Sequence, residues 1–192
     1  MKNNFNIENN VIILTGGSGN LGSIYAEYLI SNGAKVCNFD LTSPQDINKF
    51  DEKNYLFLKT DVTDKENISD SLKLVLEKFG CPQGLINNAA LDSPPGDSDV
   101  INGPFEDYPE EAWDKVIDVN LKSIFLTCQI IGKEMADNSG GSIINISSHY
   151  GLISPDQRIY NYRKNFYKPI SYSASKSGIF NITRYLSCLL YT

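Results

Sequence analysis

Thr15-Gly-Gly-Ser-Gly-Asn-Leu-Gly22 is the stretch that decides the fold of this chain. It follows an apolar run, Val11–Thr15, which predicts a buried strand, and it leads into Asn20–Ser31, where apolar residues recur at helical spacing. Glycines between a strand and a helix let backbone N–H groups approach a phosphate, and the helix dipole adds to the attraction. The position of the turn favours dinucleotide binding, although a plain tight turn would use the same residues.

The rest of the chain continues this alternation of strands and helices. A capping box, Thr63-x-x-Glu66, is expected to open the helix after the third strand. The further strands are predicted over Lys35–Asp40, Tyr55–Asp61, Gly84–Ala90 and Gly141–Ser148, and the further helices over 66–79, 109–137 and from Ser171 onward. Such an order predicts one α/β domain, residues 1–192, with a doubly wound parallel sheet in three α/β/α layers. Leu91–Tyr108 and Gly151–Pro169 are predicted to be long loops, which are often functional.

Composition excludes several other classes of protein. The chain has 192 residues, 41% hydrophobic and 21% charged, which is typical of a globular domain. Its net charge of −6 argues against nucleic-acid binding. The apolar runs are too short for a membrane span, and the polar N-terminus lacks the pattern of a signal peptide, so a cytoplasmic protein is expected. Four separated cysteines, three in apolar segments, predict buried thiols, with neither disulfides nor a metal site.

Asp40 strengthens the dinucleotide hypothesis. It ends the second predicted strand, 18 residues after Gly22. A carboxylate there can accept hydrogen bonds from the adenosine ribose and would repel a 2′-phosphate, so NAD is favoured over NADP. The alternative is a solvated aspartate at the end of a strand.

Five motifs in order resemble the short-chain dehydrogenase/reductase family, from Val11 to about Leu186. They are the glycine-rich turn, Asp61-Val62, the run Asn87-Asn88-Ala89-Ala90, Asn120, and Ile146-Ser147-Ser148 followed by Tyr172-Ser-Ala-Ser-Lys176. The resemblance implies a Rossmann-type fold and an oxidoreductase that interconverts a secondary alcohol and a ketone with NAD.

The resemblance also implies roles for single residues. The catalytic tetrad would be Asn120, Ser148, Tyr172 and Lys176. The cofactor would contact Gly16, Ser18, Gly19, Asn20, Leu21, Gly22, Asp40, Asp61, Val62 and Asn88, together with Tyr172 and Lys176. Alternative interpretations are a solvent-facing helix amide for Asn120 and a strand-end cap for Ser148.

The residue types suit proton transfer coupled to hydride transfer. A tyrosine of ordinary pKa, about 10, is a poor base at neutral pH. Lys176 lies four residues after Tyr172, on the same face of the predicted helix, so its charge favours the phenolate. Ser148 would hold the substrate oxygen, and Asn120 would position a water that relays protons through the lysine.

Three Tyr-x-x-x-Lys pairs compete for the catalytic role. Tyr55 and Lys59 lie in a predicted strand, where this spacing separates the side chains. Tyr160, paired with Lys164, follows Ser148 by 12 residues, close to the usual separation in the family, whereas Tyr172 follows it by 24. The small residues around Tyr172 and the motif Tyr-Ser-Ala-Ser-Lys-Ser-Gly, which resembles that of the family, favour Tyr172 as the catalytic tyrosine.

Two features depart from the common pattern of the family. Asn20 stands where the common form has its middle glycine, and the spacing of Gly16, Gly19 and Gly22 resembles the extended, sugar-nucleotide branch. A nucleotide-sugar epimerase or dehydratase is therefore an alternative. Relatives also continue with two more strands after the last helix, so this chain is expected to lack them, as a fragment or a short product. Full-length members form homo-oligomers, which is not assumed for this chain, and a non-catalytic dinucleotide-binding protein is a further alternative.

The segment Gln157–Lys168 suggests the substrate. It is basic and contains no acid, with Arg158, Arg163, Lys164 and Lys168. A basic loop after Ser148 would hold a phosphate or a carboxylate. The sequence around this segment resembles that of family members from surface-sugar biosynthesis clusters. This resemblance implies that the substrate is a phosphorylated or nucleotide-linked sugar alcohol. His149 would touch this substrate together with Ser148 and Arg158, or it is simply a hydrogen-bonded loop residue; a solvated basic loop is the alternative for the whole segment.

Overall fold

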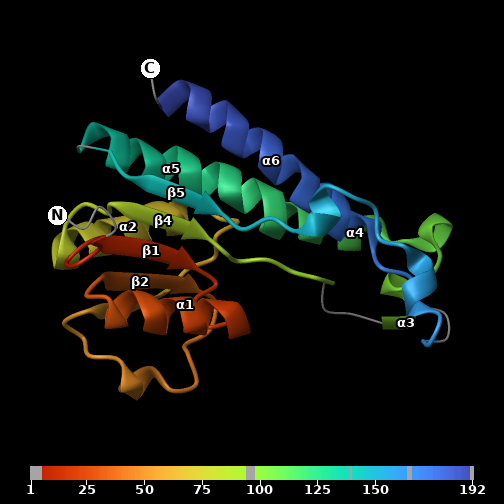
Figure 1. Ribbon diagram of the computed structural model, residues 1–192, viewed down its shortest axis with the longest axis horizontal. Coiled ribbons are helices and arrows are strands. Elements are labelled where there is room, and N and C mark those ends of the chain that lie inside the picture. Colours follow the sequence, from red (N-terminus) through yellow and green to blue (C-terminus); the bar gives the residue numbers. More distant parts are fainter. Residues whose placement is uncertain (1–5, 94–97, 139, 164–165, 191–192) are drawn as a thin grey trace. The chain divides into compact units, whose positions relative to one another are not determined.

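The computed structural model describes residues 6–93, 98–138, 140–163 and 166–190 (Figure 1). These residues form two compact units. The first unit contains residues 1–89 and 126–145, and the second contains residues 90–125 and 146–192. The expected single domain remains a prediction.

A parallel five-stranded sheet forms the centre of the first unit. Its strand order is β3-β2-β1-β4-β5. The strands are β1 (Val11–Thr15), β2 (Lys35–Asp40), β3 (Tyr55–Lys59), β4 (Gly84–Asn87) and β5 (Ser142–Asn145). Ile13 lies opposite Cys37 on one neighbour and Leu85 on the other, which fixes the register. The predicted Rossmann-type sheet is therefore confirmed, with β3, β4 and β5 shorter than expected.

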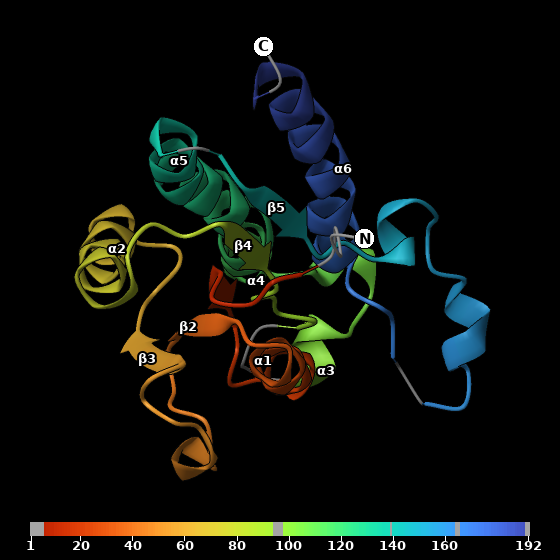
Figure 2. The ribbon, with the colours of Figure 1, turned by 60° about the vertical axis from the view of Figure 1, so that its left-hand side comes forward.

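Helices cover both faces of this sheet. Figure 2 shows α1 (Asn20–Ser31) on one face, and α2 (Lys65–Phe79) and α5 (Ser123–Asp137) on the other. Only residues 126–137 of α5 belong to the first unit. The strands are apolar because both of their faces are covered. The core under α1 contains Leu14, Ala26, Val36 and Tyr55.

The start of α2 corrects one sequence prediction. Asp64, not Thr63, is the N-cap, and its carboxylate accepts hydrogen bonds from the N–H groups of Glu66 and Asn67. Thr63 is unavailable because its N–H and hydroxyl both donate to the carboxylate of Asp61. The capping-box hypothesis was therefore wrong by one residue.

The second unit is mostly helical. Its long predicted helix consists of α4 (Glu110–Ile117), a π-helical turn (Asp118–Lys122) and the start of α5. The last helix, α6 (Ile170–Leu190), begins one residue earlier than expected. Both predicted loops contain short helices: α3 (Ser98–Ile101) and η2 (Phe105–Asp107) in the first, and η5 (Gln157–Tyr160) in the second. A further short helix, η4 (His149–Gly151), leads into the second loop.

The cysteines only partly follow the prediction of three buried thiols. Cys37 and Cys128 are buried, Cys81 is half-buried and Cys188 is exposed. Burial raises the pKa of Cys37 to about 12 and that of Cys128 to about 11.

In the described residues, no group of three or more His, Cys, Asp or Glu side chains is arranged to hold a metal. None of the described helices combines the length and apolarity that a membrane crossing needs.

Candidate active site

The glycine-rich turn has the close packing that a phosphate cradle requires. Gly16 has φ +67° and donates its N–H to the carbonyl of Phe39 at 2.8 Å. A Cβ on Gly22 would lie 2.1 Å from the carbonyl oxygen of Gly16, so no side chain fits there. Asn20 is simply the first residue of α1 and has negative φ, so the missing middle glycine does not strain the turn.

Asn88 ties this turn to the end of β4. Its side-chain amide donates to the carbonyls of Thr15 and Gly16, both at 3.1 Å. In return, the Thr15 hydroxyl accepts hydrogen bonds from the N–H groups of Asn88 and Ala89. Thus Asn88 shapes the turn itself, and its predicted contact with a cofactor remains a prediction.

Asp40 lies directly against the turn. One carboxylate oxygen accepts the N–H of Ser18 at 3.0 Å, and the other accepts the N–H of Thr42 at 3.1 Å. The second of these oxygens also accepts the Thr42 hydroxyl at 3.4 Å, whereas the first keeps a further lone pair for another donor. The carboxylate is therefore held next to the glycine-rich turn, as the NAD hypothesis requires.

Asn38 is a member of this network that sequence reasoning missed. It is fully buried in β2, and its amide oxygen accepts the N–H of Gly17 at 2.9 Å. Its NH2 group donates to the hydroxyls of Ser18, at 3.0 Å, and Tyr55, at 2.9 Å. A buried amide needs such partners, so a polar residue inside the apolar strand Val36-Cys37-Asn38-Phe39 was the available signal.

The Asp61-Val62 pair follows β3, as predicted. The Asp61 carboxylate accepts both donors of Thr63, and the Asp61 N–H donates to the side-chain oxygen of Asn67. Val62 is 8% exposed. The pair is thus fixed at the start of α2, and its contact with an adenine ring remains a prediction.

Tyr172 and Lys176 lie one turn apart on α6, in the second unit. The Lys176 Nζ is 5.8 Å from the centroid of the Tyr172 ring and donates to the carbonyl of Ile146 at 2.8 Å. Lys176 is 3% exposed, and this burial lowers its pKa to about 8. A lysine in this state both accepts and donates a proton near neutral pH.

Asn120 connects α6 to the loop before α4. Its side chain is fully buried within the π-helical turn, a feature frequent at functional sites. Its oxygen accepts the N–H of Leu91 at 2.7 Å, and its NH2 donates to the Leu91 carbonyl and the Ser175 hydroxyl. The solvent-facing alternative is therefore wrong. Both N–H groups are used within the protein, and the predicted water relay remains untested.

Ser148 and His149 lie at the start of η4. The Ser148 hydroxyl accepts the N–H of Tyr150 at 3.2 Å, which is the capping contact considered as its alternative role. The hydroxyl hydrogen remains available, so the same group can still donate to a ligand. His149 is exposed, and its ring lies 4.1 Å from that of Tyr150.

The rival tyrosines are already engaged elsewhere. The hydroxyl of Tyr160 lies 3.0 Å from that of Tyr150, which helps raise the pKa of Tyr160 to about 12 and makes it a poor base at neutral pH. Lys164, its proposed partner, lies outside the described residues. Tyr55 is buried in the first unit, where its hydroxyl accepts a hydrogen bond from Asn38.

Acidic residues outside the basic segment pair with two of its cations. Arg158 makes a bidentate contact with Asp156, at 2.9 and 2.7 Å. Lys168 pairs with Asp92, and the Lys168 Nζ also lies 4.9 Å from the centroid of the Tyr172 ring. The segment is thus less positive than its own sequence suggests.

This chain is similar to known proteins over nearly its whole length. The model of the short chain dehydrogenase family matches residues 10–192. An NAD-dependent glycerol dehydrogenase of Listeria innocua is 32% identical over 185 residues, and a sorbitol-6-phosphate 2-dehydrogenase of Klebsiella pneumoniae is 30% identical over 149 residues. A short chain dehydrogenase structure from Leptospira borgpetersenii with bound NAD+ superimposes with a TM-score of 0.79 at 28% identity.

The matches cover most of this chain but less of its relatives. The glycerol dehydrogenase match covers 95% of this chain and 65% of that protein, and the sorbitol-6-phosphate dehydrogenase match covers 77% and 55%. The Leptospira structure is matched over 94% of this chain and 65% of that one.

Proposed function

We propose, because this chain belongs to the short chain dehydrogenase family, that it interconverts a secondary alcohol and a ketone with NAD. The observation that carries the proposal is the pairing of Tyr172 with the buried Lys176 on α6. Burial lowers the pKa of Lys176 to about 8. A buried lysine next to a tyrosine ring is poorly explained by stability, because burying an ammonium group is costly. It is well explained by proton transfer.

The first unit fits a dinucleotide. The close packing at Gly22 leaves no room for a side chain there. Within the described residues, no side chain caps the start of α1, so its first backbone N–H groups lack a side-chain partner. An anion such as a pyrophosphate would satisfy these groups. Asp40 would bind the ribose hydroxyls, which favours NAD over NADP. When bound, NAD supplies the hydride acceptor.

The second unit supplies the proton chemistry. During oxidation, the Tyr172 phenolate takes the proton of the substrate hydroxyl, and Lys176 stabilises that phenolate by its charge. Ser148 donates its free hydroxyl hydrogen to the substrate oxygen. Asn120 positions this machinery through Ser175, whose hydroxyl donates to the Tyr172 carbonyl at 2.8 Å.

The direct test combines cofactor titration with turnover. Calorimetric titration should show tighter binding of NADH than of NADPH, and Asp40→Ala should reduce that preference. Turnover of NAD with a panel of polyols and sugar phosphates should be lost in Tyr172→Phe. Turnover without a requirement for Tyr172 would refute the assignment, and NAD retained without net consumption would support an epimerase instead. Absence of binding by either dinucleotide would support the non-catalytic alternative.

We further propose that the substrate is a phosphorylated or nucleotide-linked sugar alcohol, as the basic segment and the family members from surface-sugar clusters suggest. The relative from Klebsiella pneumoniae is named for sorbitol 6-phosphate. In this chain, the Arg158 side chain is 86% exposed, and an exposed ion pair contributes only about 0–1 kcal/mol. A substrate phosphate can therefore replace Asp156 at small cost.

The substrate hypothesis is tested with a matched pair of compounds. Sorbitol 6-phosphate should be oxidised with a lower KM than sorbitol. Arg158→Gln should raise the KM for the phosphorylated compound alone, whereas Asp156→Asn should lower it. Equal KM values for both compounds in the unchanged protein would contradict the anion hypothesis while leaving the dehydrogenase assignment intact.

A further inference from the structure

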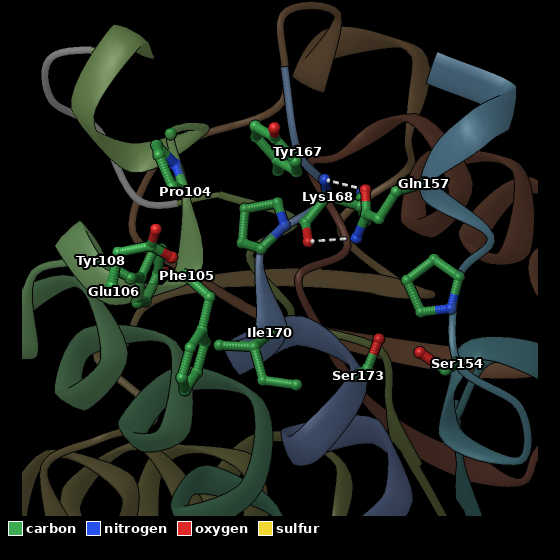
Figure 3. Close-up of a pocket in the computed structure, with 13 residues that line it drawn as sticks. Pro104, Phe105, Glu106, Tyr108, Ser154, Gln157, Tyr167, Lys168, Ile170 and Ser173 are labelled. Carbon is green, nitrogen blue, oxygen red and sulfur yellow. Dashed lines mark hydrogen bonds between the residues drawn. The ribbon is translucent and has the colours of Figure 1, made fainter. Parts of the chain in front are cut away.

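A pocket of about 340 Å³ lies within the second unit, at the start of α6 (Figure 3). Three segments far apart in sequence form it: 103–108, 154–157 and 167–173. Tyr172 and the other members of the predicted tetrad are not among the residues that line it. The volume is at the small end of the range for ligand pockets, about 300–1,000 Å³. It suits a single ring or a short chain, not a nucleotide sugar.

The basic segment is held in place to form one wall of this pocket. The Gln157 side chain accepts the N–H of Lys168 at 2.8 Å and donates to the Lys168 carbonyl at 3.2 Å, as the dashed lines in Figure 3 show. The Tyr167 N–H donates to the carbonyl of Asn102 at 2.7 Å, which joins this segment to the opposite wall. These contacts are independent of the predicted catalytic groups.

Ser173 gives the pocket an unsatisfied polar group. It is 9% exposed, and within the described structure its buried hydroxyl has no hydrogen-bond partner. Leaving such a buried group unpaired is unfavourable. Ser154 also lines the pocket, and Figure 3 shows both side chains on the same side of it. A hydroxylated ligand would satisfy the Ser173 hydroxyl, which can both donate and accept.

The charges around the pocket favour a neutral ligand. Lys168 is the one cation among the described lining residues, and it is paired with Asp92. Glu106 adds a carboxylate, which opposes anions, while the ammonium of Lys168 opposes cations. The remaining walls are rings of proline and aromatic residues, including Phe105 and Tyr167, which cover the apolar face of a ligand.

We infer that this pocket is a second, non-catalytic binding site for a neutral polyhydroxylated molecule of the size of a single sugar or a short polyol. Its ligand would fix the basic segment, whose Lys168 lies over the ring of Tyr172. Occupancy would then influence the catalytic helix without contact between this ligand and the reacting atoms. The inference does not depend on dehydrogenase activity.

Binding of glucose to the 192-residue chain, measured by saturation-transfer NMR and calorimetry, tests this site. Ser173→Ala should weaken binding about three- to tenfold, the value of one hydrogen bond. Ser177→Ala, an exposed serine on the same helix, is the matched control and should change nothing. Tyr172→Phe should also leave binding at this site unchanged, which separates it from the proposed catalytic centre.

Each other outcome would overturn the inference. Equal binding by the unchanged protein and Ser173→Ala would show that sugars do not use the pocket. Tighter binding of glucose 6-phosphate or tetramethylammonium than of glucose, with the same dependence on Ser173, would replace a neutral ligand by a charged one. Loss of binding in Tyr172→Phe would place the sugar at the catalytic site. Circular dichroism of each variant confirms that it is folded.

Discussion

Replacing Asn38 by leucine should weaken both the fold of the first unit and its binding of NADH. The leucine has a similar volume but removes three hydrogen bonds, to Gly17, Ser18 and Tyr55. The Gly17 N–H and the Tyr55 hydroxyl are both in buried residues, and each then loses its partner. At about 1–3 kcal/mol for each of these two unpaired groups, the free energy of unfolding should fall by about 2–6 kcal/mol.

Urea unfolding monitored by circular dichroism measures this change, and calorimetry should show NADH binding about tenfold weaker, because Gly17 and Ser18 belong to the turn. Tyr55→Phe is the matched control, since it removes only the contact at 2.9 Å and should cost about 1 kcal/mol. In the Asn38→Leu background, Tyr55→Phe should cost nothing, because the hydroxyl has already lost its partner. Additive effects, or unchanged stability of Asn38→Leu, would refute the network.

Three further changes test the other parts of the site. Tyr172→Phe should lower turnover by about 10²–10⁴-fold, the usual contribution of a general base, whereas Tyr160→Phe should retain it; the reverse result would exchange the two assignments. Gly22→Ala should weaken NADH binding more than tenfold, since its Cβ would lie 2.1 Å from a carbonyl oxygen; calorimetry checks this, and wild-type affinity would contradict the cradle. Burial lowers the pKa of Lys176 from 10.5 to about 8, so the unfolded lysine binds more protons between these values and its contribution to stability should rise with pH there. The raised pKa values of the buried thiols Cys37 and Cys128 act in the opposite direction above about pH 9. Urea unfolding from pH 8 to 10 should therefore show the free energy of unfolding of the unchanged protein rising relative to that of Lys176→Met; a constant difference would contradict the burial of a neutral lysine.

The sequence predicted the sheet well because its pattern reports burial directly. The strands β1 and β2 have the predicted bounds, since a parallel strand covered on both faces reads as a continuous apolar run. The predicted bounds of β3, β4 and β5 were too long because the same residue types continue into the turns. The N-cap of α2 was missed because Thr63 and Asp64 are both good caps, and only the contact of Thr63 with Asp61 decides between them.

The candidate site was predictable where a role depends on local spacing. Tyr172 and Lys176 are four residues apart, so a helix alone brings them to one face. By contrast, the pairing of Lys168 with Asp92 joins residues 76 apart, and no local pattern reveals it. The same limit explains why the positive charge of the basic segment was overestimated. Its own residues include no acid, and the acids that pair with its cations lie outside it.

Three side-chain amides hold neighbouring segments fixed; Asn38 and Asn120 are buried and Asn88 is half-buried. Asn38, Asn88 and Asn120 each use a side-chain amide to bind the backbone of a neighbouring loop or turn. An amide offers donors and an acceptor without charge, so it can be buried at lower cost than a carboxylate or an ammonium. The glycine-rich turn gains rigidity from two of these residues, although glycine itself makes a chain flexible. We therefore expect that substitution of these amides will alter cofactor and substrate affinity before it alters the strand order of the sheet.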